Sequence, residues 1–168
     1  FLDSSSTVWQ AADFLASGEA DLTAVTNDLN IATRLGANSR ITTMVTGGTA
    51  RPHSFTLLGQ PGISFLRDLW VDIALVGAHS LCNGVLSDSS VEIVELKRTV
   101  LRASKQRIVL ADSSKFSASR SFSRVAELAE VDALVTDEGI SEEDVELVTR
   151  AGVDLHVARL ESATLEGA

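Results

Sequence analysis

Short apolar runs alternate along the chain with stretches of helical periodicity. Such short runs, without alternating polar positions, are typical of parallel strands buried on both faces. They occupy residues 24–25, 41–45, 73–76, 108–111, 133–135 and 155–157. The helical stretches occupy residues 8–16, 29–35, 63–69 and 91–103, and a fifth begins at the capping box Ser141-Glu142-Glu143-Asp144. This order predicts an α/β fold in which helices flank a mostly parallel sheet.

The helix expected at residues 91–103 has apolar residues on two neighbouring stripes. Val91 and Val94 lie on one stripe, and Ile93 and Leu96 lie on the next. A helix that packs on one side only needs a single stripe. We therefore expect this helix to be covered on two sides, by the sheet and by a second subunit.

Three segments fall outside the alternation. Residues 49–62 hold both prolines and two glycines, which predicts a long connection, either an antiparallel excursion or a lid. Residues 161–168 have little to pack and are expected to fray, which leaves one domain at residues 1–160. Phe1 and Leu2 read as the end of a strand without an initiator Met or a signal peptide, so we expect an N-terminal portion to precede them.

Composition narrows the classes of function. The chain has 168 residues, of which 45% are hydrophobic, and no apolar run approaches the roughly 18 residues of a membrane span. Its single cysteine, Cys82, excludes a disulfide framework and predicts a reducing, cytoplasmic location. The net charge of −9 does not favour a polyanion, so we expect no direct contact of these residues with DNA or RNA.

The groups that follow the expected strands are the candidates for ligand binding, because ligands of open α/β sheets bind beyond the carboxyl ends of the strands. Glu92, at the start of the long helix, joins them as a group that could face a ligand hydroxyl. The alternative, which the spacing favours, is a solvated helix face or a pairing of Glu95 with Arg98. The strand-end candidates are Asp3, Ser4, Ser5, Ser6, Thr7, Thr26, Asn27, Gly47, Gly48, Gly77, Ala78, His79, Asp112, Ser113 and Lys115. The chain has no histidine or cysteine cluster with metal spacing, no G-x-G-x-x-G and no Walker A sequence, so we predict no metal and no cofactor.

Two of these segments predict an anion pocket. Asp3 to Thr7 follows a strand and opens a helix, where free N–H groups and hydroxyls suit a phosphate; the alternative is that Ser6 or Thr7 only caps the helix. Asp112 to Lys115 also follows a strand, and its lysine could reach a phosphate; the alternative is a solvated loop with an Asx-turn at Asp112. Taken together, two hydroxyl-rich strand ends and a cation favour the pocket.

The remaining candidates are more open to structural explanations. Asn27 could donate to a ligand, or Asn27 or Asp28 could cap the next helix. Gly47-Gly48 fits a turn that needs positive φ. Of the histidines, His79 is the one well placed for a ligand, whereas His156 lies in an apolar run and is interpreted as a hydrogen-bonded core residue.

The order of these motifs resembles the effector-binding domain of DeoR-family transcriptional regulators. The resemblance extends from Leu2 to about Ala158. Its most specific part is Leu96-Lys97-Arg98 followed by Asp112-Ser113-Ser114-Lys115-Phe116 and by the later Val135-Thr136-Asp137-Glu138-Gly139. The other blocks are Asp3-Ser4-Ser5-Ser6-Thr7, Thr26-Asn27, Gly47-Gly48, Gly77-Ala78, Glu92 and Thr136-Asp137-Glu138-Gly139-Ile140.

The resemblance implies a fold similar to ribose-5-phosphate isomerase and an N-terminal helix-turn-helix domain that would make the DNA contacts. It implies a phosphorylated sugar or related metabolite as effector, whose binding alters operator affinity. The family's phosphate loop maps onto Asp3 to Thr7, its next ligand loop onto Thr26-Asn27 and its lysine loop onto Asp112 to Lys115. Homodimers or homotetramers are expected, because two-fold operators match two-fold proteins.

Two positions depart from the family pattern. His79 stands where Asp is common, which removes a negative charge and makes isomerase chemistry less favoured. Ser5 stands where Gly is usual, which narrows the phosphate loop.

The leading hypothesis is a non-enzymatic sugar-phosphate sensor. Ser4 to Thr7 would hold the phosphate, Lys115 would neutralise it, and Asn27, His79 and Asp112 would read hydroxyls. One alternative is a sugar-phosphate isomerase or hydrolase, with Asp112 or Glu92 as the general base. Another is an oligomerisation domain that has lost ligand binding.

Overall fold

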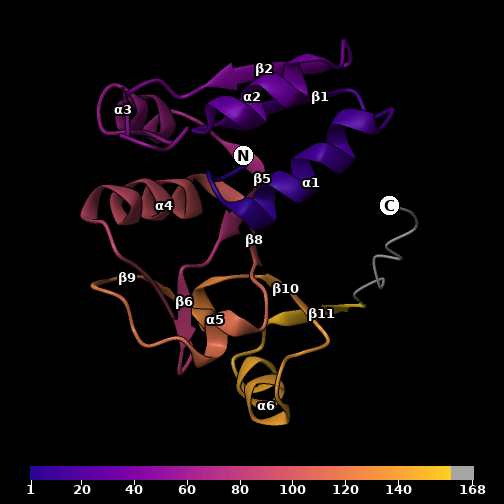
Figure 1. Cartoon of the computed structure of the whole chain (residues 1–168), viewed down its shortest axis with the longest axis vertical. Helices are drawn as coiled ribbons and strands as arrows, with labels where there is room; N and C mark the ends of the chain where they lie inside the picture. Colours follow the sequence, from indigo (N-terminus) through magenta and orange to yellow (C-terminus); the bar gives the residue numbers. More distant parts are fainter. Residues whose placement is uncertain (160–168) are drawn as a thin grey trace, which may run out of the picture.

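The computed structural model describes residues 1–159 and has the predicted α/β fold (Figure 1). The helices are α1 (Ser6–Ser17), α2 (Leu29–Gly36), α3 (Gly62–Arg67), α4 (Val91–Ala103), α5 (Ser114–Ser117) and α6 (Glu142–Arg150), with a 3₁₀ turn η1 (Leu128–Glu130). The strands are β1 (Leu22–Thr26), β2 (Ile41–Val45), β3 (Thr49–Ala50), β4 (Leu57–Leu58), β5 (Val71–Gly77), β6 (Ser80–Cys82), β7 (Val85–Asp88), β8 (Ser104–Leu110), β9 (Ser123–Glu127), β10 (Ala133–Asp137) and β11 (Asp154–Ala158).

The first residues of the chain act as a strand of the parallel sheet. Leu2 bridges in parallel to Thr26 of β1 and to Leu75 of β5, so it joins the pair β2–β1 to the four strands β5–β8–β10–β11. The Leu2 N–H donates to the Val25 carbonyl at 2.8 Å, and the Leu75 N–H donates to the Phe1 carbonyl at 2.9 Å. The prediction that Phe1 and Leu2 belong to a strand is confirmed.

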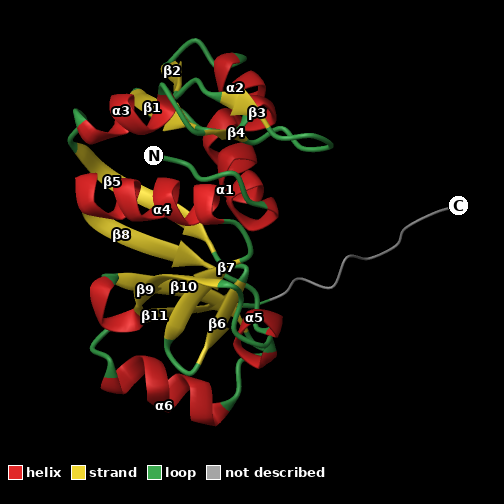
Figure 2. Cartoon of the chain, turned by 90° about the vertical axis from the view of Figure 1, so that its left-hand side faces the viewer, coloured by secondary structure: helices red, strands yellow, loops and turns green. Residues whose placement is uncertain are grey.

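The inner strands β1, β5 and β10 are buried over most of the predicted apolar runs. The edge strands β2 and β11 are largely exposed, so the prediction of burial on both faces is wrong for residues 41–45 and 155–157. In β5, Ala74 and Val76 pack into the larger core cluster with Val94 of α4, whereas Leu75 packs against the smaller cluster that holds Val8 of α1. The helix predicted at residues 91–103 is α4, with the same bounds. Figure 2 shows α3 and α4 side by side in front of the sheet.

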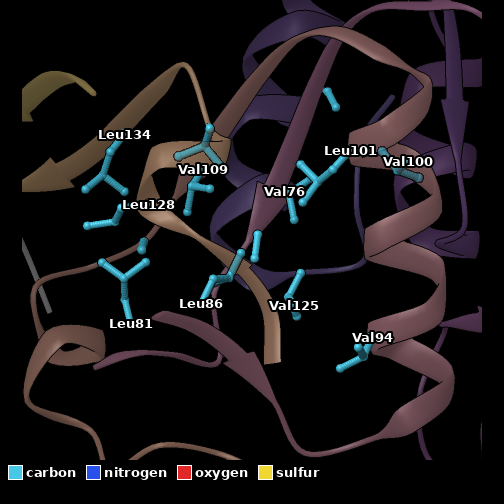
Figure 3. Packing of buried hydrophobic residues seen from close by; sticks show 14 of the residues in the cluster. Val76, Leu81, Leu86, Val94, Val100, Leu101, Val109, Val125, Leu128 and Leu134 are labelled. Carbon is cyan, nitrogen blue, oxygen red and sulfur yellow. The ribbon is translucent and has the colours of Figure 1, made fainter. Parts of the chain in front are cut away.

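A small antiparallel sheet, β6–β7–β9, was not predicted. Asn83 and Gly84 have φ values of 51° and 74° and connect β6 to β7, as in a two-residue hairpin. Leu81, Leu86 and Val125 of this sheet pack with residues of the parallel sheet and α4 (Figure 3). The larger core therefore lies between the two sheets and α4.

Helix caps and the long connection refine the predictions. The cap of α1 is Ser5 rather than Ser6 or Thr7, and the cap of α2 is Asp28, whose Oδ1 accepts two helix N–H groups. Residues 49–62 form the antiparallel pair β3–β4 and lead into α3. Ser141 caps α6 as predicted. The tail at residues 161–168 lies outside the described residues.

The interpretation of His156 as a core residue is wrong. His156 lies on β11, the edge strand, and its side chain is exposed, with Nε2 3.0 Å from Asp154 Oδ2. An apolar run at a sheet edge lacks the second covering layer that buries the central strands.

One arginine–carboxylate pair connects the middle of β8 to the residue before β10. The Arg107 guanidinium donates two bonds of 2.9 Å to the Asp132 carboxylate, and the Arg107 backbone N–H donates a third at 2.7 Å. These bonds hold the pKa of Asp132 below its ordinary value of 3.8. Asp132 therefore stabilises the fold above pH 4, and this contribution is lost as the pH falls through its folded pKa.

Replacing Asp132 by Asn is expected to lower the free energy of unfolding by about 1 kcal/mol at pH 7. The difference from the parent chain is expected to shrink as the pH falls below about 4, because the parent carboxylate becomes protonated there. Urea unfolding at a series of pH values between about 7 and 3 measures both effects. A difference that stays constant over this range would contradict the linkage.

Candidate functional site

The carboxyl edge of the parallel sheet gathers the predicted site. Thr26 ends β1, Asp3 follows the Leu2 bridge, Gly77 ends β5 and Asp112 follows β8. These strands are neighbours in that order and all run parallel. With roughly 4.8 Å between strands, the segments at Asp3 and Asp112 lie on the order of 10 Å apart. One ligand of sugar-phosphate size could span both.

The serine loop at Asp3–Thr7 is held by hydrogen bonds to the loop that follows β1. The Ser4 N–H donates to Asn27 Oδ1 at 3.1 Å, and the Ser4 hydroxyl donates to Asp28 Oδ2 at 2.6 Å. The Ser4 Oγ also lies 2.6 Å from Thr56 Oγ1, just before β4. Ser4 is therefore the point where three segments of the chain meet.

The buried Thr26 and Asn27 shape this edge from below. The Thr26 hydroxyl donates to the Leu2 carbonyl at 2.8 Å and accepts from the Asp28 N–H at 3.1 Å. The Asn27 Nδ2 donates to the Leu57 carbonyl at 3.4 Å while its Oδ1 holds Ser4. Both side chains position the serine loop and have their polar atoms occupied.

The centre of the site is a buried ion cluster around Lys97. Its ammonium donates to the Gly77 carbonyl and to Asp88 Oδ2, both at 2.8 Å, and lies 3.4 Å from Asp3 Oδ2. Asp3 Oδ2 also accepts from the Gly77 N–H at 3.0 Å. All three side chains are at least nine-tenths buried. The cluster joins the first strand, β5, β7 and α4.

The pKa values of this cluster follow from burial and from the two carboxylates. Burial raises the pKa of Asp3, and the charge of Lys97 opposes that shift only in part. Burial alone would lower the pKa of Lys97, but the two carboxylates together raise it. Lys97 is therefore a charged ammonium whose donors are used inside the protein.

Gly77 and Gly48 are required by close contacts. A Cβ on Gly77 would lie 2.2 Å from Ser5 Oγ and 2.4 Å from Ser5 Cβ, so the helix cap of α1 rests directly on this backbone. Gly48 has a φ of 119°, and a Cβ there would lie 2.5 Å from the Leu58 carbonyl oxygen. Gly47 also has a positive φ, at 75°. The positive-φ turn proposed for Gly47-Gly48 is confirmed.

His79, Ala78 and Glu92 lie at the rim. Ala78 is half-buried against the larger core, whereas the His79 side chain is exposed. Glu92 is exposed at the start of α4, where the Ser90 hydroxyl donates to it at 2.6 Å and lowers its pKa.

The lysine loop forms a second part of the edge. Asp112 accepts from the Ser114 N–H at 3.1 Å and from the Ser114 hydroxyl, and this hydroxyl bond is the largest cause of its lowered pKa. Lys115 Nζ lies 3.5 Å from Asp112 Oδ2, and a third of its side chain is exposed. The Asx-turn considered for Asp112 is present, and the lysine remains accessible from solvent.

The lysine loop is anchored to the loop after β10. Asp137 Oδ2 accepts from the Ser113 N–H at 2.8 Å, and Asp137 Oδ1 accepts from the Gly139 N–H at 2.9 Å. A Cβ on Gly139 would lie 2.5 Å from Ser113 Oγ, so the two loops are in close contact. The loops at Ser113 and Asp137 are 24 residues apart in sequence, but they lie in direct contact in the fold.

Four residues of the site were not among the predicted ligand residues: Lys97, Asp88, Asp28 and Thr56. Asp28 was predicted only as a possible helix cap, and Lys97 was named only within the block Leu96-Lys97-Arg98. A signal for Lys97 was present, since it lies three residues from both Val94 and Val100 on the buried face of α4. A lysine on an apolar stripe needs buried partners. Nothing local marks Asp88 or Thr56, which reach the site through β7 and the β3–β4 hairpin.

Two hollows with defined volumes lie elsewhere, over α4. They measure about 750 and 280 Å³, and none of the predicted ligand residues lines them. Within residues 1–159, no three His, Cys, Asp or Glu side chains gather as a metal site would require. None of the helices in that range has the length and apolar character that a bilayer crossing requires.

Comparison with known proteins assigns the family. The family model described as the DeoR C terminal sensor domain matches residues 1–138. The chain belongs to the DeoR sensor-domain family. The match covers the serine loop, the Lys97 cluster and the lysine loop.

Relatives of the sensor domain are transcriptional regulators. It is 35% identical over 156 residues to the HTH-type transcriptional repressor GlcR of Bacillus subtilis, covering 93% of this chain and 59% of the relative. It is 31% identical over 161 residues to the HTH-type regulator YgbI of Escherichia coli, covering 96% and 62%. It is 30% identical over 137 residues to the glycerol-3-phosphate regulon repressor of Haemophilus influenzae, covering 81% and 52%. The chain thus spans between 52% and 62% of the length of these relatives.

Replacing Gly77 by Ala in the sensor domain is expected to lower the free energy of unfolding by about 1–3 kcal/mol, because the new Cβ must displace Ser5. Gly36→Ala is the matched control, since nothing lies within 4 Å of a Cβ there. The control is expected to be neutral or stabilising by up to about 1 kcal/mol. Urea unfolding of both variants is the measurement, and equal stabilities would exclude the contact with Ser5.

Replacing Lys97 by Met is expected to cost about 3–5 kcal/mol, because Asp3 and Asp88 then stay buried without a cation. Lys105→Met is the control, because Lys105 is exposed near the amino end of β8, away from the carboxyl edge of the sheet where the cluster lies. Thermal and urea unfolding report the difference. A loss below about 1 kcal/mol would mean that the two carboxylates are neutral or solvated in the fold.

Proposed function

We propose that the sensor domain binds a phosphorylated sugar or a related metabolite at the carboxyl edge of its sheet. In the whole protein, this binding would change the operator affinity of an N-terminal helix-turn-helix domain in a cytoplasmic regulator of sugar metabolism. The relatives support this proposal, since they include a repressor named for glycerol-3-phosphate and a putative repressor of the aga operon. Repression by the whole protein is the activity that these relatives favour.

The start of α1 is the observation that carries the proposal. The N–H groups of Ser6 and Val8 form no hydrogen bond to any group within residues 1–159, and only Thr7 is bonded to the cap at Ser5. Free N–H groups at the positive end of a 12-residue helix favour a phosphate. The serine hydroxyls of the same loop add neutral donors.

A ligand anion at the serine loop would be balanced by a surface cation rather than by Lys97. Lys97 compensates Asp3 and Asp88 internally, so it contributes little free positive charge at the surface. Lys115 is an accessible cation on the same edge, and Asp112 lies beside it. We assign Lys115 to the phosphate or an adjoining sugar oxygen, and Asp112 and His79 to hydroxyl groups.

A non-enzymatic role is favoured by the state of the two candidate bases. Hydrogen bonds from Ser90 and Ser114 lower the pKa values of Glu92 and Asp112, respectively. A carboxylate with a lowered pKa is a weak general base near neutral pH. Neither side chain therefore has the property that the isomerase alternative requires.

The contacts of Ser4 suggest how binding would be sensed. Its hydroxyl connects Asp28 before α2 with Thr56 of the hairpin, and a phosphate that took up this hydroxyl would compete with both contacts. A ligand shifts only the equilibrium between states that it binds with different affinity. Such a ligand would favour one position of the β3–β4 hairpin relative to α1 over another.

A thermal-shift panel of phosphorylated sugars tests the proposal, with the unphosphorylated sugars and inorganic phosphate as controls. A ligand at about 100 times its Kd adds roughly 2.7 kcal/mol. For a domain of this size we expect a rise in Tm of roughly 5–10 °C. Lys115→Ala should abolish the rise, whereas Lys105→Ala at the opposite end of β8 should keep it.

A rise that survives Lys115→Ala would exclude the assigned role of the lysine loop. No rise with any phosphorylated sugar, in a sample that melts cooperatively, would favour the oligomerisation-only alternative.

A further inference from the structure

The outer side of α4 carries a groove that the ligand site does not use. We call it the α4 groove: a hollow of about 750 Å³ between the end of α3, the connection to β5 and the exposed face of α4. Figure 2 looks onto this side of the molecule, with α3 above α4. Its lining includes Trp70, Val91, Glu95, Arg98 and Arg102.

The groove has an exposed aromatic ridge. Trp70 is 96% exposed and Val91 is 57% exposed, although both are large apolar residues. Phe122, next to the lining residue Ser123, is 80% exposed. Tryptophan and arginine are the residues most enriched at the energetic centres of protein interfaces. A ridge beside a hollow on one patch also allows two copies to fit into each other.

The charges on the outer face of α4 are divided along the helix. Val91, Glu95, Arg98 and Arg102 follow the spacing of one helical face. The negative Glu95 lies in the first half of α4. Asp68, the residue after α3, also lines the groove. Arg102 lies seven residues beyond Glu95, about 10 Å along the axis.

The unpaired charges of the groove have opposite signs. Within residues 1–159, the side chains of Asp68 and Arg102 form no hydrogen bond or ion pair, and Glu95 has one 3.4 Å contact with Arg67. A two-fold axis between Arg98 and Thr99 would place two α4 helices antiparallel. Glu95 of each copy would then face Arg102 of the other copy.

We propose that the α4 groove binds a second copy of this chain in a two-fold, antiparallel contact of the α4 helices. The net charge of −9 makes two copies repel each other over most orientations. The lining of the α4 groove has three arginines and two carboxylates, so this face lacks the net negative charge of the chain as a whole and can pair opposite charges across a two-fold axis. Trp70 of each copy enters the groove beside the α4 helix of the other, and the contact is isologous. The observations behind this proposal involve none of the residues assigned to the ligand site.

Sedimentation velocity and light scattering of the 168-residue chain test the contact, across about 1–100 µM. The expected mass is twice 17.8 kDa. Trp70→Ala is expected to weaken the dimer at least tenfold, which is the effect of removing an interface anchor. Phe14→Ala is the matched control, because Phe14 is 79% exposed on α1, outside the groove, and should leave the dimer unchanged.

Charge reversal tests the antiparallel pairing directly. Glu95→Arg alone and Arg102→Glu alone each bring like charges together and should give monomers. An equimolar mixture of the two variants should form dimers again, because each copy then supplies the charge that the other lacks. The double variant should also dimerise. Circular dichroism and Tm values establish that each variant is folded.

Three outcomes would overturn the proposal. The parent chain could be a monomer at every concentration, or its oligomer could resist Trp70→Ala and both reversals. The oligomer could also dissociate with Phe14→Ala while Trp70→Ala leaves it intact, which would place the contact at α1. Thermal shifts by phosphorylated sugars are measured separately, so either proposal can fail alone.

Discussion

One buried ammonium, that of Lys97, holds the site together. It donates to a carbonyl at the end of β5 and to Asp88 at the end of β7, and it lies beside Asp3 after the first strand. Desolvating one cation and two carboxylates is costly, and the cost is offset only while all three remain in contact. The positions of α4, β5 and β7 relative to the first strand therefore depend on each other. The same cluster fixes the position of the serine loop, because Asp3 is the first residue of that loop and also accepts a hydrogen bond from the Gly77 N–H.

The contacts of the Lys97 cluster explain why the carboxyl edge of the sheet can be rich in polar groups and still be ordered. Thr26, Asn27 and Asp28 use their polar atoms on backbone groups and on Ser4, so few donors there point to solvent. The helix N–H groups at the start of α1 and the side chain of Lys115 are among the groups left for a ligand. Some polar residues at this edge therefore hold the loops in place, and others remain available to a ligand.

The parallel strands and α4 could be predicted from the sequence because each has a local apolar pattern, as at residues 133–135 and 91–103, and these residues are largely buried. The hairpin at Asn83-Gly84, which was not predicted, had a local signal in the sequence, a two-residue turn between apolar residues. The ion cluster had a partial signal in the lysine on the buried face of α4. Its partners, Asp3 and Asp88, are 94 and nine residues from Lys97 in sequence, and pairing at such distances depends on topology rather than on local pattern.

The two faces of α4 connect the proposed ligand site with the proposed subunit contact. Lys97 on its inner face is bonded to the strand ends, whereas Glu95 and Arg102 lie on the face that lines the groove. A single helix of 13 residues that packs against both regions is a contiguous physical link between them. A ligand that changed the packing of Asp3 or Gly77 against Lys97 would therefore reach the groove without a further moving part. Coupling of this kind is reciprocal, so association of two copies would alter ligand affinity by the same factor.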